Sequence, residues 1–251
     1  MEYSKVFGPT DSVASVVANG RLKTQIGSNY DIRPDGPYTI YKMRVAKGNV
    51  ANAKECAGIL EIIATGVDGT FEYAYGNGTG GATNSGQNGP AEEIECSIPL
   101  KKASIISVYV NDAEIAKDVT ISLMLKKGSG RKVQSYATGG GTFDCTADTL
   151  LALTNIKPTS GGMIKEIRVA GSVVADAEAG SAKLVLNIPG LKGPFEYAIG
   201  NGPGGATLGG PQHADVIDLP GGIPVKENVV VTVEMTAAED LKSPTVSVQV
   251  V

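Results

Sequence analysis

The stretch FEYAYGNGTGGAT at residues 71–83 occurs a second time, as FEYAIGNGPGGAT, at residues 195–207. The same offset aligns residues 31–83 with residues 155–207 without a gap, and about 23 of these 53 positions are identical. Similarity over such a length indicates a duplicated domain, because a short shared motif does not extend into the flanking sequence.

The aligned positions include residues well outside the glycine-rich stretch. Arg44 aligns with Arg168, and after one inserted residue Ser122 aligns with Ser247. Each half is therefore expected to be a complete unit with its own beginning and end.

The repeat divides the 251 residues into two domains of about 125 residues, close to the commonest domain size. We expect an N-terminal arm at residues 1–11, a first domain at residues 12–127 and a second domain at residues 128–251. The joint at residues 127–131, KGSGR, is typical of a short flexible link. A link this short keeps the two domains side by side.

The pattern within each half predicts strands. Short segments rich in Val, Ile, Thr and Tyr alternate with period two and are separated by Gly, Pro, Asn and Asp. In the first half the expected strands are residues 13–17, 22–26, 38–46, 58–65, 70–75, 94–99, 104–110 and 119–125. In the second half they are residues 142–146, 149–155, 163–170, 183–188, 194–199, 216–219, 229–235 and 245–250. The chain is thus predicted to be all-β, with two tandem eight-stranded antiparallel β-sandwiches.

Two pairs of connectors have helical propensity but a length of two turns at most. They are residues 49–57 with residues 173–180, and residues 112–118 with residues 236–242.

Composition argues against two classes of protein. The net charge of -4 and the absence of a clustered basic face disfavour direct nucleic-acid binding. No apolar run approaches the roughly 18 residues of a membrane span, and the first twenty residues do not resemble a signal peptide. We therefore expect a chain made and kept in the cytosol.

The glycines of the repeated stretch satisfy a dinucleotide-binding fingerprint, Gly76-x-Gly78-x-x-Gly81 in the first copy. That fingerprint requires a helix whose N-terminus faces the pyrophosphate. Here the following residues, NSGQNGP at 84–90, do not favour a helix. The second copy, from Gly200 to Gly205, is followed by LGGP. We expect structural loops that hold no cofactor.

Residues that could carry catalysis or bind a metal are sparse. His213 is the only histidine, and the three cysteines show no C-x-x-C spacing. Acidic groups do not recur at equivalent positions of the two halves, and Asp31 and Asp35 lack calcium-loop spacing. The cysteines are Cys56, Cys96 and Cys145; the acidic groups are Glu92, Glu93 and Glu95, and Glu234, Glu239 and Asp240. We expect no catalytic, cofactor-binding or metal-binding residues and no enzymatic activity.

Two eight-stranded sandwiches in tandem, without a catalytic constellation, resemble the double jelly-roll major capsid proteins of tailless icosahedral viruses. The resemblance covers nearly the whole chain and rests on architecture. It implies two upright jelly rolls and a homotrimer with a pseudo-six-fold outline in an icosahedral shell, so that the chain is made in the host cytoplasm and found in the virion. It also implies that residues 1–11 reach toward neighbouring subunits, other capsid proteins or an internal membrane, and that the glycine-rich loops lie at contacts.

Two other functions remain open from the sequence. One is a cell-surface or filament-forming β-sandwich protein, in which an exposed edge or a terminal arm adds a strand to the next subunit. The other is a carbohydrate-binding or hydrolytic β-sandwich, whose carboxylates would meet only in space. The chain contains no tryptophan for sugar stacking.

Overall fold

The computed structural model describes most of both halves of the chain. The described residues are 2–7, 24–25, 36–49, 56–77, 91–112, 116–139, 144–145, 151–153, 155–173, 181–200, 214–237 and 241–251. Within these ranges all regular elements are strands, and no helix is long and apolar enough to span a membrane.

The first half is built from strands that pair in a nested order. Its strands are β1 (Glu2–Phe7), β2 (Thr24–Gln25), β3 (Tyr38–Asn49), β4 (Cys56–Ala64), β5 (Glu72–Asn77), β6 (Glu92–Leu100), β7 (Ile106–Asp112) and β8 (Ala116–Lys127). β1 pairs with β8, β2 with β7, β3 with β6 and β4 with β5, all antiparallel. Further pairing produces sheet A, in the order β1-β8-β3-β6, and sheet B, in the order β2-β7-β4-β5.

The second half repeats this scheme. Its strands are β9 (Gln134–Gly139), β10 (Asp144–Cys145), β11 (Leu151–Ala152), β12 (Gly162–Val173), β13 (Ser181–Asn187), β14 (Phe195–Gly200), β15 (Asp215–Val225), β16 (Thr232–Ala237) and β17 (Leu241–Val250). Sheet C runs β10-β17-β12-β15, with β9 also paired to β17, and sheet D runs β11-β16-β13-β14. The nested pairs are β9 with β17, β11 with β16, β12 with β15 and β13 with β14.

Two sheets pack face to face around a hydrophobic core in each half, so each half is sandwich-like. In β8, Ile121, Leu123 and Leu125 are buried, and the side chains between them are only partly covered. This is the alternation of a strand with one face in the core. Separate buried clusters, one from Tyr38 to Leu125 and one from Tyr136 to Val250, fill the two halves.

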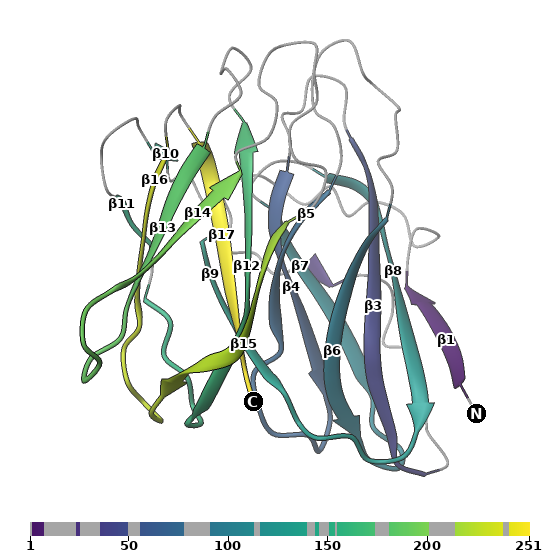
Figure 1. Ribbon diagram of the computed structural model, residues 1–251. Coiled ribbons are helices and arrows are strands. Elements are labelled where there is room, and N and C mark those ends of the chain that lie inside the picture. The colour runs from purple at the N-terminus through teal and green to yellow at the C-terminus, as the bar shows by residue number, and fades with distance from the viewer. Residues whose placement is uncertain are drawn as a thin grey trace.

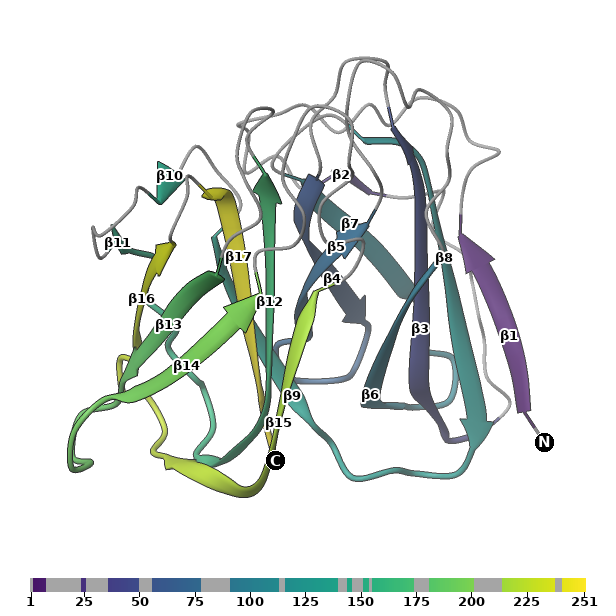
Figure 2. The same cartoon turned by 45° about the horizontal axis from the view of Figure 1, so that its top comes forward.

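The four sheets lie side by side in the order D, C, B, A (Figures 1 and 2). Sheet C of the second half faces the first half, and sheets D and A lie at opposite ends of the molecule. In β17, all side chains from Thr245 to Val250 are buried. Val246, Val248 and Val250 join the core of the second half, so the alternate polar residues lie on the face toward the first half.

Several sequence predictions need correction. Residues 1–11 were expected to form an arm, but Glu2–Phe7 within them pair with β8 along the edge of sheet A. β9 was not predicted, because Gln134–Gly139 shows no apolar alternation. The expected helical connector at residues 112–118 instead overlaps two strands, since β7 ends at Asp112 and β8 begins at Ala116. The connector at 236–242 likewise enters β16 and β17.

Other sequence predictions cannot be compared in full. The predicted strand at residues 13–17 lies outside the described residues, as do most of the connectors at 49–57 and 173–180.

Candidate functional site at the interface of the two halves

The interface is centred on β5, the edge strand of sheet B. Phe71 accepts a hydrogen bond from Ile62 in β4 through its carbonyl oxygen. Because the hydrogen-bonding direction alternates along a strand, Glu72, Ala74 and Gly76 direct their backbone groups away from β4. An edge of this kind presents unpaired N–H and C=O groups that need partners once they are buried.

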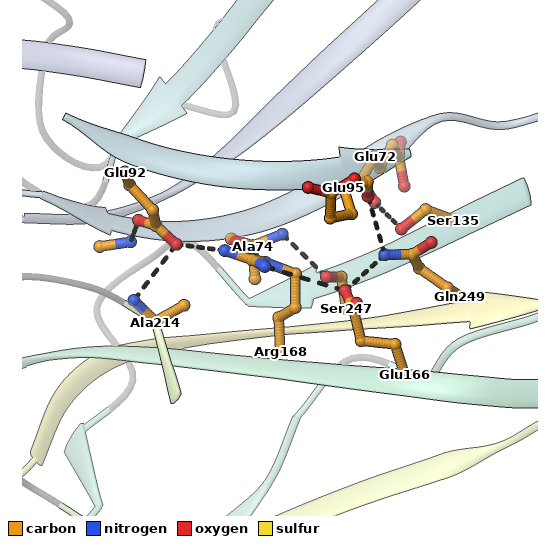
Figure 3. Close-up of polar contacts among 11 residues, drawn as sticks. Glu72, Ala74, Glu92, Glu95, Ser135, Glu166, Arg168, Ala214, Ser247 and Gln249 are labelled. Atoms are coloured by element: carbon orange, nitrogen blue, oxygen red, sulfur yellow. Dashed lines mark hydrogen bonds and ion pairs between the residues drawn. The ribbon is translucent and has the colours of Figure 1, made fainter. Parts of the chain in front are cut away.

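Side chains on the outer face of sheet C supply those partners (Figure 3). The Ser247 hydroxyl accepts a hydrogen bond from the Ala74 N–H at 2.9 Å, and the Arg168 Nε donates to the Ala74 carbonyl at 3.1 Å. The Ser135 hydroxyl donates to the Glu72 carbonyl, and its N–H donates to the Thr70 carbonyl at 3.0 Å. The edge of β5 is thus bound by side chains from β17, β12 and β9, with little conventional strand pairing.

Arg168 also forms a buried ion pair with Glu92 of β6, and both side chains are only 3% exposed. Glu92 accepts further hydrogen bonds from the Gly76 N–H at 3.0 Å and the Ala214 N–H at 3.3 Å. Burial raises the pKa of the Glu92 carboxyl, and the Arg168 guanidinium opposes that rise. A charge pair with this many hydrogen bonds can hold two surfaces in one register, since removal of either partner leaves a buried charge uncompensated.

A second polar group continues the interface along β17. Gln249 donates through Nε2 to the Glu95 carbonyl at 3.2 Å and to the Glu166 carboxylate. Burial raises the pKa of Glu166, while Arg168 and the Gln249 hydrogen bond lower it. The negative charges of Asp218 and Glu95 add to the rise.

The segment that joins the two halves is held against the first half. Thr39 donates through Oγ1 to the Gly128 carbonyl at 2.8 Å, and it accepts from the Gly130 N–H at 2.6 Å. Val133 donates to the Ser97 carbonyl at 3.0 Å. The link predicted to be flexible is therefore fixed by hydrogen bonds to β3 and β6, which favours one relative position of the halves.

The residues singled out from the sequence are placed unevenly. Of the two glycine-rich stretches, Gly76 lies in β5 and Gly200 in β14, and the loops that follow lie outside the described residues. The same is true of His213, Asp31, Asp35, Glu239 and Asp240. No structural description therefore applies to the predicted loop contacts.

The acidic cluster of β6 divides between two surroundings. Glu92 is buried in the interface, whereas Glu93 and Glu95 lie on the exposed face of sheet A. There Lys42 contacts both Glu93 and Glu95 at 3.0 Å, and Arg44 contacts Glu93 at 3.4 Å. In the second half, Glu234 accepts a hydrogen bond from Asn187 at 2.9 Å. These contacts give each of these acidic residues a structural role.

Cys96 is the one cysteine whose side chain can be described. Its Sγ lies 3.5 Å from the Ile40 carbonyl oxygen, and burial raises the pKa of the thiol. A thiol held in its protonated form is a poor nucleophile. Cys56 and Cys145 lie in β4 and β10, and their side chains fall outside the description.

Among the described residues, no three His, Cys, Asp or Glu side chains are grouped closely enough to hold a metal ion. A shallow pocket of about 460 Å³ lies beside the link, between turns of the first half. It is lined by Pro37, Gly66, Val67, Asp68, Pro99, Leu100, Lys101, Lys102, Ser129 and Lys132. Its three lysines are exposed, and Lys132 already donates to the Asp68 carbonyl.

Sequence reasoning missed Arg168, Ser135 and Ser247 as interface residues. One signal was present: in β17 the polar residues Thr245, Ser247 and Gln249 alternate with valines, although a strand on an exposed face shows the same pattern. Comparison with known proteins adds no further identification, since no protein-family model matches the chain and no curated protein does so.

Proposed function

We propose that the protein is a structural self-assembling protein, and that it serves as the major capsid protein of an icosahedral virus. The single observation that carries the proposal is the nested strand pairing found in both halves. A folded ribbon with pairs 1·8, 2·7, 3·6 and 4·5, rolled into two sheets of order 1-8-3-6 and 2-7-4-5, has the topology of a jelly roll. Jelly rolls of eight strands are frequent in viral capsids.

The rigid junction of the halves supports the same proposal. Two rolls in one chain occupy two positions of a six-fold arrangement, so three chains complete it. Such an arrangement requires a fixed angle between the rolls. The Arg168–Glu92 pair and the bound link provide features that fix that angle. In this proposal the chain is not an enzyme, it acts as a homotrimer, and its place is the virion.

A hydrolytic role receives less support from the interface carboxylates. Glu92 and Glu166 both lie near Arg168, but Glu92 is 3% exposed and already accepts from three donors, the Arg168 guanidinium and two backbone N–H groups. A carboxylate in these surroundings has no access to a glycosidic substrate.

The filament-forming alternative is favoured by one observation, the exposed edge of β14. Glu196 and Ala198 of this strand are exposed, whereas the corresponding edge of β5 is covered. An open edge can pair with another chain.

The proposal is tested by measuring the mass of the purified protein by light scattering and its shape by negative-stain electron microscopy. We expect compact trimers or closed shells. Fibres would favour the filament-forming protein, and a stable monomer at all concentrations would contradict self-assembly.

A further inference from the structure

We propose that a second copy of this chain docks its β14 edge onto the outer face of sheet A, by the same contacts that join the two halves within one chain. The inference rests on the proposed self-assembly and names the surfaces that carry it. The repeat supplies two copies of each side of the internal interface. One copy of each side joins the two halves, and the other copy of each side takes no part in that interface.

Ser135, Arg168 and Ser247, whose side chains bind the edge of β5, have identical counterparts on sheet A. Strand register makes Arg44 equivalent to Arg168 and Ser122 equivalent to Ser247, since Arg44 pairs with Ser122 and Arg168 pairs with Ser247. Ser4, opposite Met124 in β1, takes the position of Ser135, which lies opposite Gln249 in β9. Sheet A therefore carries Ser, Arg and Ser at the three positions that bind an edge strand in sheet C.

The strand that is capped also has a counterpart. FEYA at residues 71–74 is repeated at residues 195–198, in β14, which is the edge strand of sheet D as β5 is of sheet B. Ala74 is buried against Ser247 and Arg168, while Ala198 is exposed. The β14 edge thus has the same local sequence as the edge of β5. Among the described contacts, no face of its own chain binds it as sheet C binds β5.

Where the two copies differ in sequence, a change on the edge strand is accompanied by a change at the position that faces it. In the first half the Thr70 N–H donates to the Gln134 side chain at 3.2 Å. The counterpart of Thr70 is Pro194, which has no N–H, and the register places Tyr3 at the position of Gln134. The glutamine amide that accepts from Thr70 is therefore replaced by another side chain where the N–H donor is missing.

Charges also match across the proposed contact. The sequence predicted no recurrence of the acidic groups, but strand register makes Asp215 the counterpart of Glu92, since Val45 pairs with Glu92 and Val169 with Asp215. In the proposed contact an acid of the second copy therefore faces Arg44, as Glu92 faces Arg168. Within the chain Glu166 lies near Glu95, an unfavourable pairing of like charges. Their counterparts are Lys42 and Asp218, whose charges are opposite.

The two surfaces lie at opposite ends of the molecule, with sheet D at one end and sheet A at the other (Figures 1 and 2). A contact between them is head-to-tail, and such contacts form a closed ring when the rotation closes and a filament when it does not. The proposed contact can therefore join three copies in a closed ring, and the same contact can join copies in a filament.

The test uses two variants, each altered on one surface. Arg44→Glu alters sheet A, and Ala198→Arg alters the β14 edge. Both positions are exposed in the single chain, so circular dichroism and thermal unfolding of each variant should match the unaltered protein. If Ala198→Arg does not fold, Asp215→Arg, at another exposed position, replaces it.

For each variant alone we expect the dissociation constant of self-association to rise ~tenfold or more, because the altered groups lie at the centre of the contact. Mixed together, the two variants should form 1:1 dimers, since one retains its β14 edge and the other its sheet A face. Sedimentation velocity measures both results.

Two outcomes would overturn the inference, and they are distinguishable. If the unaltered protein assembles and the variants assemble equally well, or if the mixture stays monomeric, another surface is responsible and self-assembly itself stands. If the unaltered protein is monomeric at every concentration, the interface and the proposed function both fail.

Discussion

Arg168 and Arg44 occupy equivalent positions in the two halves, yet the side chain of Arg168 is 3% exposed and that of Arg44 is 47% exposed. Arg168 crosses to the other half, where it binds Glu92 and the Ala74 carbonyl. Arg44 contacts Glu93 of its own sheet at 3.4 Å. One ancestral surface position therefore serves two structural roles, and the difference arises from what lies opposite each sheet.

Arg168→Ala should strongly destabilise the protein. The substitution leaves the Glu92 carboxylate buried without its cation, which typically costs ~3–5 kcal/mol of the free energy of unfolding. Urea denaturation followed by circular dichroism measures the loss, at a protein concentration too low for self-association. Arg44→Ala is the matched control, and we expect little change because exposed ion pairs contribute little. Equal losses in the two variants would show that Arg168 does not join the halves.

Glu92→Gln should change how stability depends on pH. Because burial raises the pKa of Glu92, the folded protein takes up this proton at higher pH than the unfolded chain does. Ionised Glu92 therefore opposes folding, and its contribution to the free energy of unfolding rises as pH falls from the folded-state pKa toward the ordinary value of 4.5, then levels off. The amide side chain introduced by Glu92→Gln cannot titrate in this range.

The measurement is a set of urea denaturation curves between pH 7 and pH 4 for both proteins. The difference in the free energy of unfolding between the unaltered protein and Glu92→Gln should grow in favour of the unaltered protein as pH falls. Glu166→Gln should act in the same direction, since burial also raises the pKa of Glu166. Curves that stay parallel for Glu92→Gln would contradict a raised pKa at this carboxyl.

Ser247→Ala should destabilise the interface through the backbone of β5. The Ala74 N–H is buried and donates to the Ser247 hydroxyl at 2.9 Å, so removal of that acceptor leaves the donor unsatisfied. Such a loss costs ~1–3 kcal/mol. Hydrogen exchange at Ala74 should also accelerate. Ser122→Ala is the matched control in the single chain, and an equal effect there would argue against a specific role for Ser247.

The strands of the two cores could be predicted from the sequence because their apolar residues alternate. β8 and β17 are examples, with aliphatic side chains at every second position. β15 was predicted only as residues 216–219, but it extends from Asp215 to Val225 through Pro220 and Pro224. Proline is tolerated there because β15 is an edge strand, where an N–H is not needed on the outer side.

The interface could not be predicted from either copy alone. Arg44 and Arg168 share the local sequence RVA, and Ser122 and Ser247 lie in similar strands. Local propensity and alternation are therefore the same at both sites. Burial of Arg168 depends on the approach of β5 from the other half, which is a tertiary contact with no local signal.

Gly162→Ala should destabilise the second half by steric overlap. A Cβ at Gly162 would lie 2.6 Å from the Val251 carbonyl oxygen and 2.9 Å from Val250 Cγ1. The backbone of Val251, which follows β17, cannot yield easily, because Met163 and Val251 exchange two hydrogen bonds of 3.0 Å at the same place. Overpacking of this kind typically costs ~1–3 kcal/mol, measured by thermal or urea unfolding. Gly221→Ala in β15 is the control, since a Cβ there meets no atom within 4 Å. If Gly162→Ala unfolds at the same urea concentration as Gly221→Ala, the close approach of β12 and the C-terminal residue does not exist in solution.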